Sequence, residues 1–179
     1  MSSIDHDLSH NWSASSHKGV DYAIKLPSDV QKTWSYIILL LPFLAIFIGG
    51  LVWPIDETTQ TENVLRPPAW FMYTAWAVIT LAYGVVWNQL YIAHSDRWLL
   101  HFMFSLPIIL SVIWLILYNG AGLMVEASWV LYALQAALIV ITAAVAGLSD
   151  IPEWTVFLLP FLGWVMLGTD LNVQDVLAD

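Results

Sequence analysis

Residues 34–53 read WSYIILLLPFLAIFIGGLVW and contain no charged side chain. A helix needs about 20 predominantly apolar residues to cross the ~30 Å hydrocarbon core of a bilayer, and this segment meets that requirement. Four further segments are long and predominantly apolar, at 69–93, 98–118, 127–148 and 154–172, and the last is the weakest because Asp170 lies in its final turn. Because an open sheet cannot satisfy its backbone polar groups in lipid, we expect an all-α membrane protein whose five transmembrane helices form a bundle.

The composition of the whole chain also indicates a lipid environment. Hydrophobic residues make up 59% of the 179 residues and charged residues only 11%, whereas soluble domains carry about 25% charged residues. The net charge of −9 argues against nucleic acid as a partner, because its phosphates require Lys and Arg. The absence of cysteine excludes disulfides, thiolate metal sites and cysteine nucleophiles.

The two ends of the chain are polar. Residues 1–33 lack the basic start and apolar stretch of a secretory signal, and we expect a mostly disordered tail there. Residues 173–179 are expected to form a short acidic tail. The distribution of Lys and Arg favours a cytoplasmic N-terminus, but it rests on 5 residues and the orientation stays open. The choice among mitochondrial outer membrane, endomembrane and bacterial envelope stays open as well.

Tryptophan is the most unusual feature of the composition, with 11 residues. An aromatic belt at the headgroup level is sufficient to explain those at span ends, which are Trp34, Trp53, Trp70, Trp98 and Trp154. Trp76 and Trp164 instead lie well inside their segments, in the membrane half next to residues 54–66. The second segment also carries an aromatic and mildly polar face at steps of three and four, made of Tyr73, Trp76, Thr80, Tyr83, Gly84 and Trp87. These residues either line a pocket for a flat aromatic or sterol-like ligand or fill the bundle centre, and the pattern does not decide between the two.

The fourth segment combines a polar line with small residues that allow close helix packing. The polar line repeats every seven residues, at Ser128, Gln135 and Thr142. Helix packing explains both features, and Gln135 is the best candidate in this segment for a ligand contact. Three prolines inside the spans are expected to bend their helices and to widen the bundle locally, namely Pro42, Pro107 and Pro160.

The spans carry little reactive chemistry. They contain no acid–base pair, two-histidine metal spacing, phosphate loop or nucleophile elbow, so no catalytic or metal-ligating residue is predicted. Ion-coupled transport is disfavoured, because the one candidate for a membrane carboxylate is Asp170, near the end of the last span. His101 suits either an axial haem ligand or a hydrogen-bonded packing residue, and a lone histidine near a span end is more often the latter.

Two stretches resemble the TspO/MBR family, which includes the translocator protein and the bacterial tryptophan-rich sensory proteins. Pro67-Pro68-Ala69-Trp70, with Trp76 and Gly84 beyond it, is similar to the opening of that family's second helix. Residues 158–165, LLPFLGWV, with Leu171-Asn172 beyond them, are similar to its fifth-helix signature. The chain departs from the family pattern at Leu65, Ser111 and Phe161, where Trp, Asn and Tyr are usual.

The resemblance implies a five-helix bundle, often a homodimer, whose pocket under the first loop takes porphyrins, haem or cholesterol. We therefore expect a membrane-embedded binding protein for tetrapyrrole or sterol-like ligands that acts in transport, sequestration or stress signalling. No cofactor is required, and porphyrin or haem would be a ligand. The expected site is built from Trp53, Trp70, Tyr73, Trp76, Trp114, Gln135 and Trp164.

Two other functions stay open at this point. Some family members are reported to degrade porphyrin in light with tryptophan participation, and by resemblance Trp70 and Trp164 are the residues to test. The alternative from another class is a structural or assembly subunit of a larger membrane complex that binds no small molecule. In that case the tryptophans would serve belt and packing roles.

Overall fold

Helices form almost all of the chain that the computed structural model describes, namely residues 29–54, 66–95, 97–147 and 152–178. Five helices are long and apolar enough to cross a membrane. They are α1 (Asp29–Val52), α2 (Ala69–Ala93), α3 (Trp98–Leu115), α4 (Met124–Ala146) and α5 (Leu159–Ala178). The π-helical turn η1 (Ile116–Gly120) extends α3, and the 3-10 helix η2 (Pro152–Phe157) precedes α5. The described residues contain no strand, and the predicted all-α bundle of five membrane-spanning helices is confirmed.

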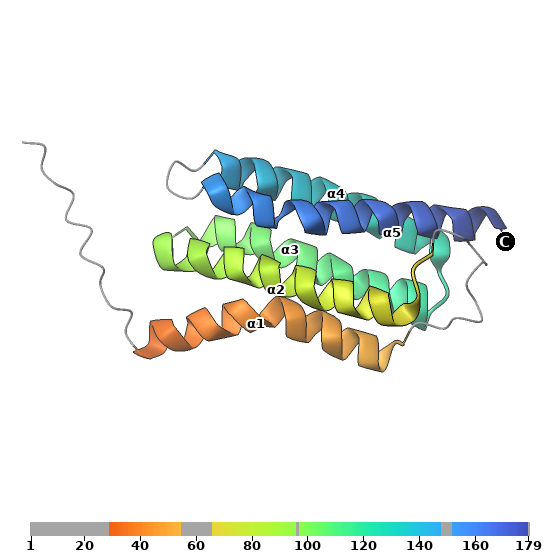
Figure 1. Cartoon of the computed structure of the whole chain (residues 1–179), viewed down its shortest axis with the longest axis horizontal. Helices are drawn as coiled ribbons and strands as arrows, with labels where there is room; N and C mark the ends of the chain where they lie inside the picture. The colour runs from red at the N-terminus through yellow and green to blue at the C-terminus, as the bar shows by residue number, and fades with distance from the viewer. Residues whose placement is uncertain (1–28, 55–65, 96, 148–151, 179) are drawn as a thin grey trace, which may run out of the picture.

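The five helices run side by side along the long axis of the molecule (Figure 1). α1 packs on α2, α2 on α5, α5 on α4 and α4 on α3, and α3 returns to α1. The helices therefore form a closed ring in which α1 is held by α2 and α3. The end of this bundle where α1 finishes and α2 begins is called here the first-loop end, and η1 and the last turns of α5 lie at the same end (Figure 1).

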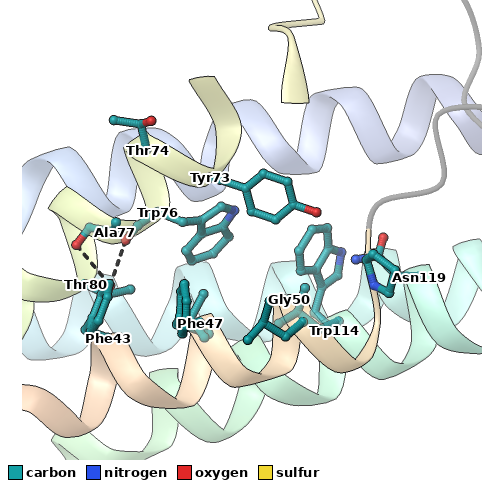
Figure 2. A pocket seen from close by; sticks show the side chains of 14 residues that line it. Phe43, Phe47, Gly50, Tyr73, Thr74, Trp76, Ala77, Thr80, Trp114 and Asn119 are labelled. Carbon is teal, nitrogen blue, oxygen red and sulfur yellow. Dashed lines mark hydrogen bonds between the residues drawn. The ribbon is translucent and has the colours of Figure 1, made fainter. Parts of the chain in front are cut away.

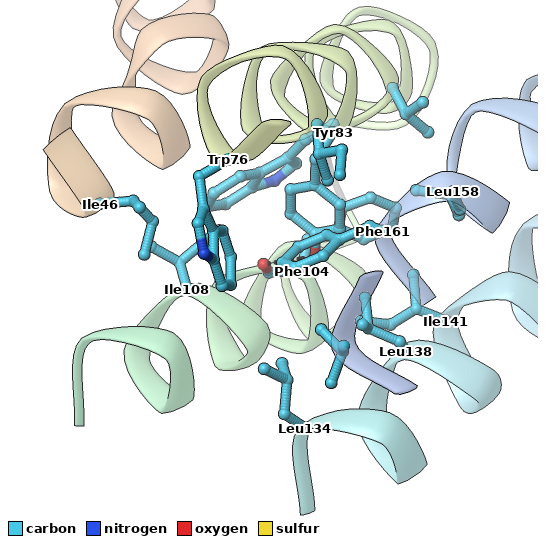
Figure 3. Packing of buried hydrophobic residues seen from close by; sticks show 14 of the residues in the cluster. Ile46, Trp76, Tyr83, Phe104, Ile108, Leu134, Leu138, Ile141, Leu158 and Phe161 are labelled. Atoms are coloured by element: carbon cyan, nitrogen blue, oxygen red, sulfur yellow. Dashed lines mark hydrogen bonds between the residues drawn. The ribbon is translucent and has the colours of Figure 1, made fainter. Parts of the chain in front are cut away.

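Aromatic side chains fill the centre of the bundle. Tyr83 of α2, Phe104 of α3 and Phe161 of α5 are fully buried, and the Tyr83 ring lies 5.3 Å from each of the other two, centroid to centroid. The Tyr83 hydroxyl donates a 2.8 Å hydrogen bond to the Phe104 carbonyl oxygen, which satisfies the one polar group of this cluster. Figure 3 shows the three rings converging with Trp76 between α2, α3 and α5.

The ends of the predicted spans differ from the structure in several places. α1 begins at Asp29 and α5 continues to Ala178, so residues 29–33 and 173–178 are helical where tails were expected. The last turns of α5 stay helical because Asn172 and Asp175 are buried with hydrogen-bond partners inside the bundle. Pro160 lies in the first turn of α5, where its missing N–H disrupts no helical bond, and so it does not bend a span. The remainder of the predicted N-terminal tail, residues 1–28, lies outside the described residues.

A close contact between α1 and α2 sets the shape of the space between them. A Cβ atom built on Gly84 would lie 2.1 Å from the backbone oxygen of Leu39, so the two helices touch at this point. α1 bends near its middle (Figure 1), where Pro42 removes one helical hydrogen bond. The bend follows the contact by less than one turn, and the second half of α1 diverges from α2 toward the first-loop end.

Replacing Gly84 with alanine is expected to lower the thermal midpoint of the purified protein. The new Cβ would meet the backbone of α1, which cannot rotate away, and such overpacking costs about 1–3 kcal/mol. Gly163→Ala is the matched control, because a Cβ at this position of α5 meets no atom within 4 Å. That control should gain up to about 1 kcal/mol from helix propensity. Equal midpoints for the two variants in thermal unfolding would contradict the Gly84 contact.

Candidate ligand-binding site

A cavity of about 640 Å³ lies between α1, α2 and the end of α3, in the half of the bundle that leads to the first-loop end. Its volume is within the ~300–1,000 Å³ of typical small-molecule sites. We call it the α1–α2 pocket. It is lined by Phe43, Ile46, Phe47, Gly50, Leu51, Pro54, Tyr73, Thr74, Trp76, Ala77, Thr80, Trp114, Leu115 and Asn119. Figure 2 shows it as a slot between α1 and the indoles of Trp76 and Trp114.

The local sequence explains why this slot stays open. The Gly84 contact holds α1 and α2 together at one end of it, and the bend near Pro42 separates them beyond that point. Gly50 and Ala77 then present almost no side chain to the slot from the two sides. The ring of Tyr73 fits against Gly50, where an added Cβ would lie 3.4 Å from Tyr73 Cε1.

Two stacked indoles form the deep wall of the pocket. The rings of Trp76 and Trp114 are 6.1 Å apart at an interplanar angle of 27°. Behind this wall, Phe161 and Trp164 meet Trp76 edge-on at 5.9 and 6.4 Å. The opposite, α1 side carries Phe43 and Phe47, which stack on each other at 5.5 Å. A flat apolar ligand in the slot would therefore have aromatic rings on both sides.

The structure brings three of the seven predicted site residues into the pocket lining, namely Tyr73, Trp76 and Trp114. Trp53 lies at the end of the pocket without lining it: its carbonyl oxygen accepts a 3.1 Å hydrogen bond from Asn119, and its ring covers Gly120. Trp164 lies behind Trp76, and Trp70 is 69% exposed and contacts Phe71. Neither of these two residues borders the cavity.

Gln135 is the predicted ligand contact that the structure places elsewhere. Its Nε2 donates a 2.5 Å hydrogen bond to the Thr169 hydroxyl, which links α4 to α5 on the side of the bundle away from the pocket. A buried amide between two apolar helices requires a partner, and Thr169 supplies it. Gln135 is therefore a packing residue of the α4–α5 contact.

Sequence reasoning missed the α1 side of the pocket and Asn119. From Tyr36 onward α1 is apolar all round, so no periodic pattern singled out Phe43 or Phe47. Asn119 lies in η1, where one π-helical turn shifts the register of α3 and directs its side chain to the pocket end. Such turns occur often at functional sites. Asn119 could have been identified from its position in the sequence. It precedes Gly120, where the helix ends, and it is the one Asn or Gln between residues 98 and 120.

The pocket is polar at one end only. Thr80 donates to the carbonyl oxygens of Trp76 and Ala77, and Thr74 donates to that of Trp70, so both hydroxyl protons are used within α2. Asn119 uses one amide hydrogen on Trp53, and its Oδ1 accepts no hydrogen bond from the described residues. Figure 2 shows Asn119 beyond Trp114 with the Tyr73 hydroxyl directed toward the same end. A ligand can thus exchange hydrogen bonds with the first-loop end of the slot.

A buried ion pair supports the pocket from behind. Arg66 Nη2 lies 2.6 Å from Asp175 Oδ1 and 2.5 Å from Oδ2, and the Arg66 and Asp175 side chains are 15% and 1% exposed. The hydroxyl of Tyr118 donates to the same carboxylate, and its ring stacks on Trp114 at 5.3 Å and 17°. The Trp114 indole N–H also donates to Asn172 Oδ1, at 3.3 Å. The end of α5 therefore holds one of the two wall indoles in place.

Arg66 keeps its charge in this network. Burial acts to lower the pKa of Arg66, but the hydrogen bonds and charges of Asp175 and Tyr118 outweigh it and raise that pKa. When folding raises the pKa of a base, the folded state is stabilised at every pH below the pKa of that base in the unfolded chain. The stabilisation is lost only as the pH rises through the pKa of the base in the folded protein. Arg66 titration thus contributes no change in stability between about pH 5 and 9.

His101 acts as a packing residue, the second of its two predicted roles. Its Nδ1 accepts a 3.3 Å hydrogen bond from the Trp87 indole, and its Nε2 lies 3.0 Å from the carbonyl oxygen of His94, to which it donates. Both ring nitrogens are used, so neither is available to a haem iron. Among the described residues, no three His, Asp or Glu side chains converge as metal ligands would.

Comparison with known proteins adds no family assignment to this geometry. No protein-family model matches the chain, and no curated protein matches it significantly.

Proposed function

We propose that this protein is a membrane-embedded binding protein for large, flat apolar ligands of the tetrapyrrole or sterol type, acting in transport, sequestration or stress signalling. The observation that carries the proposal is the α1–α2 pocket of about 640 Å³, with stacked indoles on one wall and phenylalanine rings on the other. Such a cavity with few polar groups is typical of sites for apolar ligands.

The phase from which the ligand enters, water or lipid, determines which interactions in the pocket must provide its affinity. A ligand already dissolved in lipid gains little from the hydrophobic effect, because lipid tails are as apolar as the pocket. Its affinity must come from shape and ring stacking, and each favourable aromatic pair contributes ~0.5–1.5 kcal/mol. Trp76, Trp114 and Phe47 can provide such contacts on both sides of a flat ligand. A flexible acyl chain would make fewer of them.

The resemblance to the TspO/MBR family supports the same ligand classes. Its two stretches lie at the start of α2 and across the start of α5, and each supplies an indole to the wall or its backing, namely Trp76 and Trp164. We propose on this basis that the chain is a divergent member of that family. Light-dependent porphyrin breakdown would be an extension of binding, and Trp76 rather than Trp70 is the indole in position to meet a porphyrin.

A second candidate function is favoured by the outer face of α4. Small residues at steps of three, seven and four are exposed along this helix, which would let a partner helix approach closely: Ala133, Ala136, Ala143 and Gly147. A structural subunit or a homodimer would use this face. Fixed partners after purification in mild detergent, together with no saturable ligand binding, would favour the subunit over the binding protein.

The binding function is tested by titrating the purified protein with protoporphyrin IX, its neutral dimethyl ester and dehydroergosterol. We expect saturable tryptophan quenching at one ligand per chain for at least one probe. At 100 times the dissociation constant, that probe should stabilise the fold by about 2.7 kcal/mol, seen as a higher thermal midpoint. Trp114→Phe should reduce the rise in midpoint, whereas Trp98→Phe, at an exposed site on the opposite end, should leave it unchanged. Linear quenching without a shift in midpoint for all three probes would contradict the proposal.

A further inference from the structure

The charges around the α1–α2 pocket restrict what it can hold. Among the described residues, its lining contains no Lys, Arg, His, Asp or Glu. Arg66 lies at the same end of the bundle, but its guanidinium is already bound to Asp175 and Tyr118. The remaining described cations, Lys32 and Arg97, begin α1 and α3 at the opposite end. An anionic group in the slot would therefore be desolvated without a counter-charge, which is strongly unfavourable.

The single polar end fixes the orientation of a ligand. Asn119 offers a second amide hydrogen and an Oδ1 that accepts no hydrogen bond from the described residues, so it can donate to a hydroxyl or carbonyl oxygen and accept from a hydroxyl group. From there the slot runs past Trp114 and Trp76 to Phe43, and the Thr74 and Thr80 hydroxyl groups along it donate to backbone carbonyl oxygens of α2. A fitting ligand has one neutral head group and a flat apolar body.

The depth of the slot matches one leaflet of a bilayer. From Phe43 to Pro54 the α1 side extends roughly 16 Å at 1.5 Å per residue, which is about half of the ~30 Å hydrocarbon core. Its polar end lies at the first-loop end, where α1 finishes and α2 begins. An amphiphile in that leaflet already has its head at the same level and its body pointing the same way. It could move into the slot without rotating or passing through water.

The slot also has a side that faces lipid. Phe47 and Leu51 of α1 line the pocket and are nevertheless 52% and 67% exposed, and Tyr73 and Thr74 are exposed across from them on α2. These four residues border the gap that opens between the two helices beyond the bend of α1. Since they belong to membrane-spanning segments, the gap opens toward the acyl chains.

We infer that the pocket takes a neutral, flat, polycyclic amphiphile with a single hydrogen-bonding head group, that the ligand enters sideways from one leaflet between α1 and α2, and that Asn119 binds its head. This inference rests on the proposed binding function and narrows it. Dianionic porphyrins are excluded as ligands of this pocket, and Asn119 determines the specificity of the site.

The test measures competition against dehydroergosterol in phosphatidylcholine nanodiscs, followed by energy transfer from tryptophan. Three competitors share one ring system: cholesterol, cholesterol sulfate and 5α-cholestane, which lacks the hydroxyl group. We expect cholesterol sulfate to compete at least tenfold more weakly than cholesterol. Cholestane should compete about three- to tenfold more weakly than cholesterol, because the loss of one hydrogen bond reduces affinity by about that factor. Protoporphyrin IX should likewise bind at least tenfold more weakly than its dimethyl ester.

Asn119→Leu separates head-group binding from a structural effect. In the variant, the affinity for cholesterol should fall to that for cholestane, and the affinity for cholestane should stay unchanged. Asn88→Leu is the matched control, because Asn88 accepts a hydrogen bond from Ser35 on the same pair of helices, but on the far side of the Leu39–Gly84 contact. It should change neither competitor.

Four results would overturn the inference, and they are distinguishable. A sulfate or a free-acid porphyrin that binds as tightly as its neutral partner would show that charge is accepted. Equal weakening of cholesterol and cholestane by Asn119→Leu would show that Asn119 only supports the fold. An unchanged preference for cholesterol in the variant would place the head elsewhere. Saturable binding of none of the probes would remove the proposed function together with the inference.

Discussion

Ala77→Phe is expected to weaken ligand binding at least tenfold while the bundle stays folded. Ala77 lies on the α2 side of the pocket and lines it together with Trp76 of α2 and Phe47 of α1. A phenyl ring there would stand across the slot and occupy the space between the two aromatic walls. Because the position already borders a cavity, the ring displaces no packed side chain, and the overpacking penalty of a filled core does not apply.

The expected readout is loss of energy transfer to dehydroergosterol at ligand concentrations that saturate the wild type. Ala133→Phe is the matched control, since it adds the same ring to an exposed position on the outer face of α4. It should bind as the wild type does. Unchanged affinity in Ala77→Phe, with a folded helical spectrum, would show that the ligand binds somewhere other than the α1–α2 pocket.

Asp175→Asn should cause the largest loss of stability among single substitutions near the site. The change removes the charge that faces Arg66 and leaves a guanidinium that is 15% exposed beside a neutral amide. Removing one partner of a buried ion pair typically costs ~3–5 kcal/mol of stability. Since Arg66 keeps some contact with solvent, we expect about 2–4 kcal/mol. Titration of the purified protein with denaturant would measure this loss as a lower free energy of unfolding.

The same substitution should also reduce ligand affinity, because Tyr118 loses its acceptor and stacks less firmly on Trp114. Asp170→Asn provides the control within the same helix: Asp170 is exposed and accepts one hydrogen bond from Gln174. Its effect should stay within ±0.5 kcal/mol. If Asp175→Asn is no more destabilising than Asp170→Asn, the ion pair does not hold the first-loop end together.

The fold was predictable because lipid imposes a simple length rule. Four of the five predicted spans contain no Asp, Glu, Lys or Arg, and the fifth contains only Asp170. Only helices satisfy the backbones of such stretches in a bilayer. The ends were harder to predict, because a polar sequence at the end of a span is compatible with either a tail or a buried turn. Asp175 belongs to an acidic stretch, which predicts solvent exposure. In the structure Asp175 is instead buried and paired with Arg66, a basic residue far away in the sequence.

The pocket was predictable only in part. The period of three to four residues on the second span grouped Tyr73 with Trp76, and both line the α1–α2 pocket, since side chains on one helical face share one neighbourhood. The same reasoning could not assign residues among different helices. Trp164 therefore lies behind the wall instead of in it, and Gln135 meets Thr169. Phe43 carries no periodic signal, because every position from Tyr36 to Trp53 is apolar.

The most direct test of the account is photo-crosslinking with a diazirine derivative of cholesterol in nanodiscs, followed by mass spectrometry of the labelled peptides. We predict adducts on Phe43–Pro54 of the α1 side and on Tyr73–Thr80 of α2, both suppressed by excess unlabelled cholesterol. Ala77→Phe should remove them, and Ala133→Phe should not. Adducts spread evenly over the lipid-facing surface, or confined to α4 and α5 and insensitive to competition, would contradict the claim that the protein binds its ligand between α1 and α2.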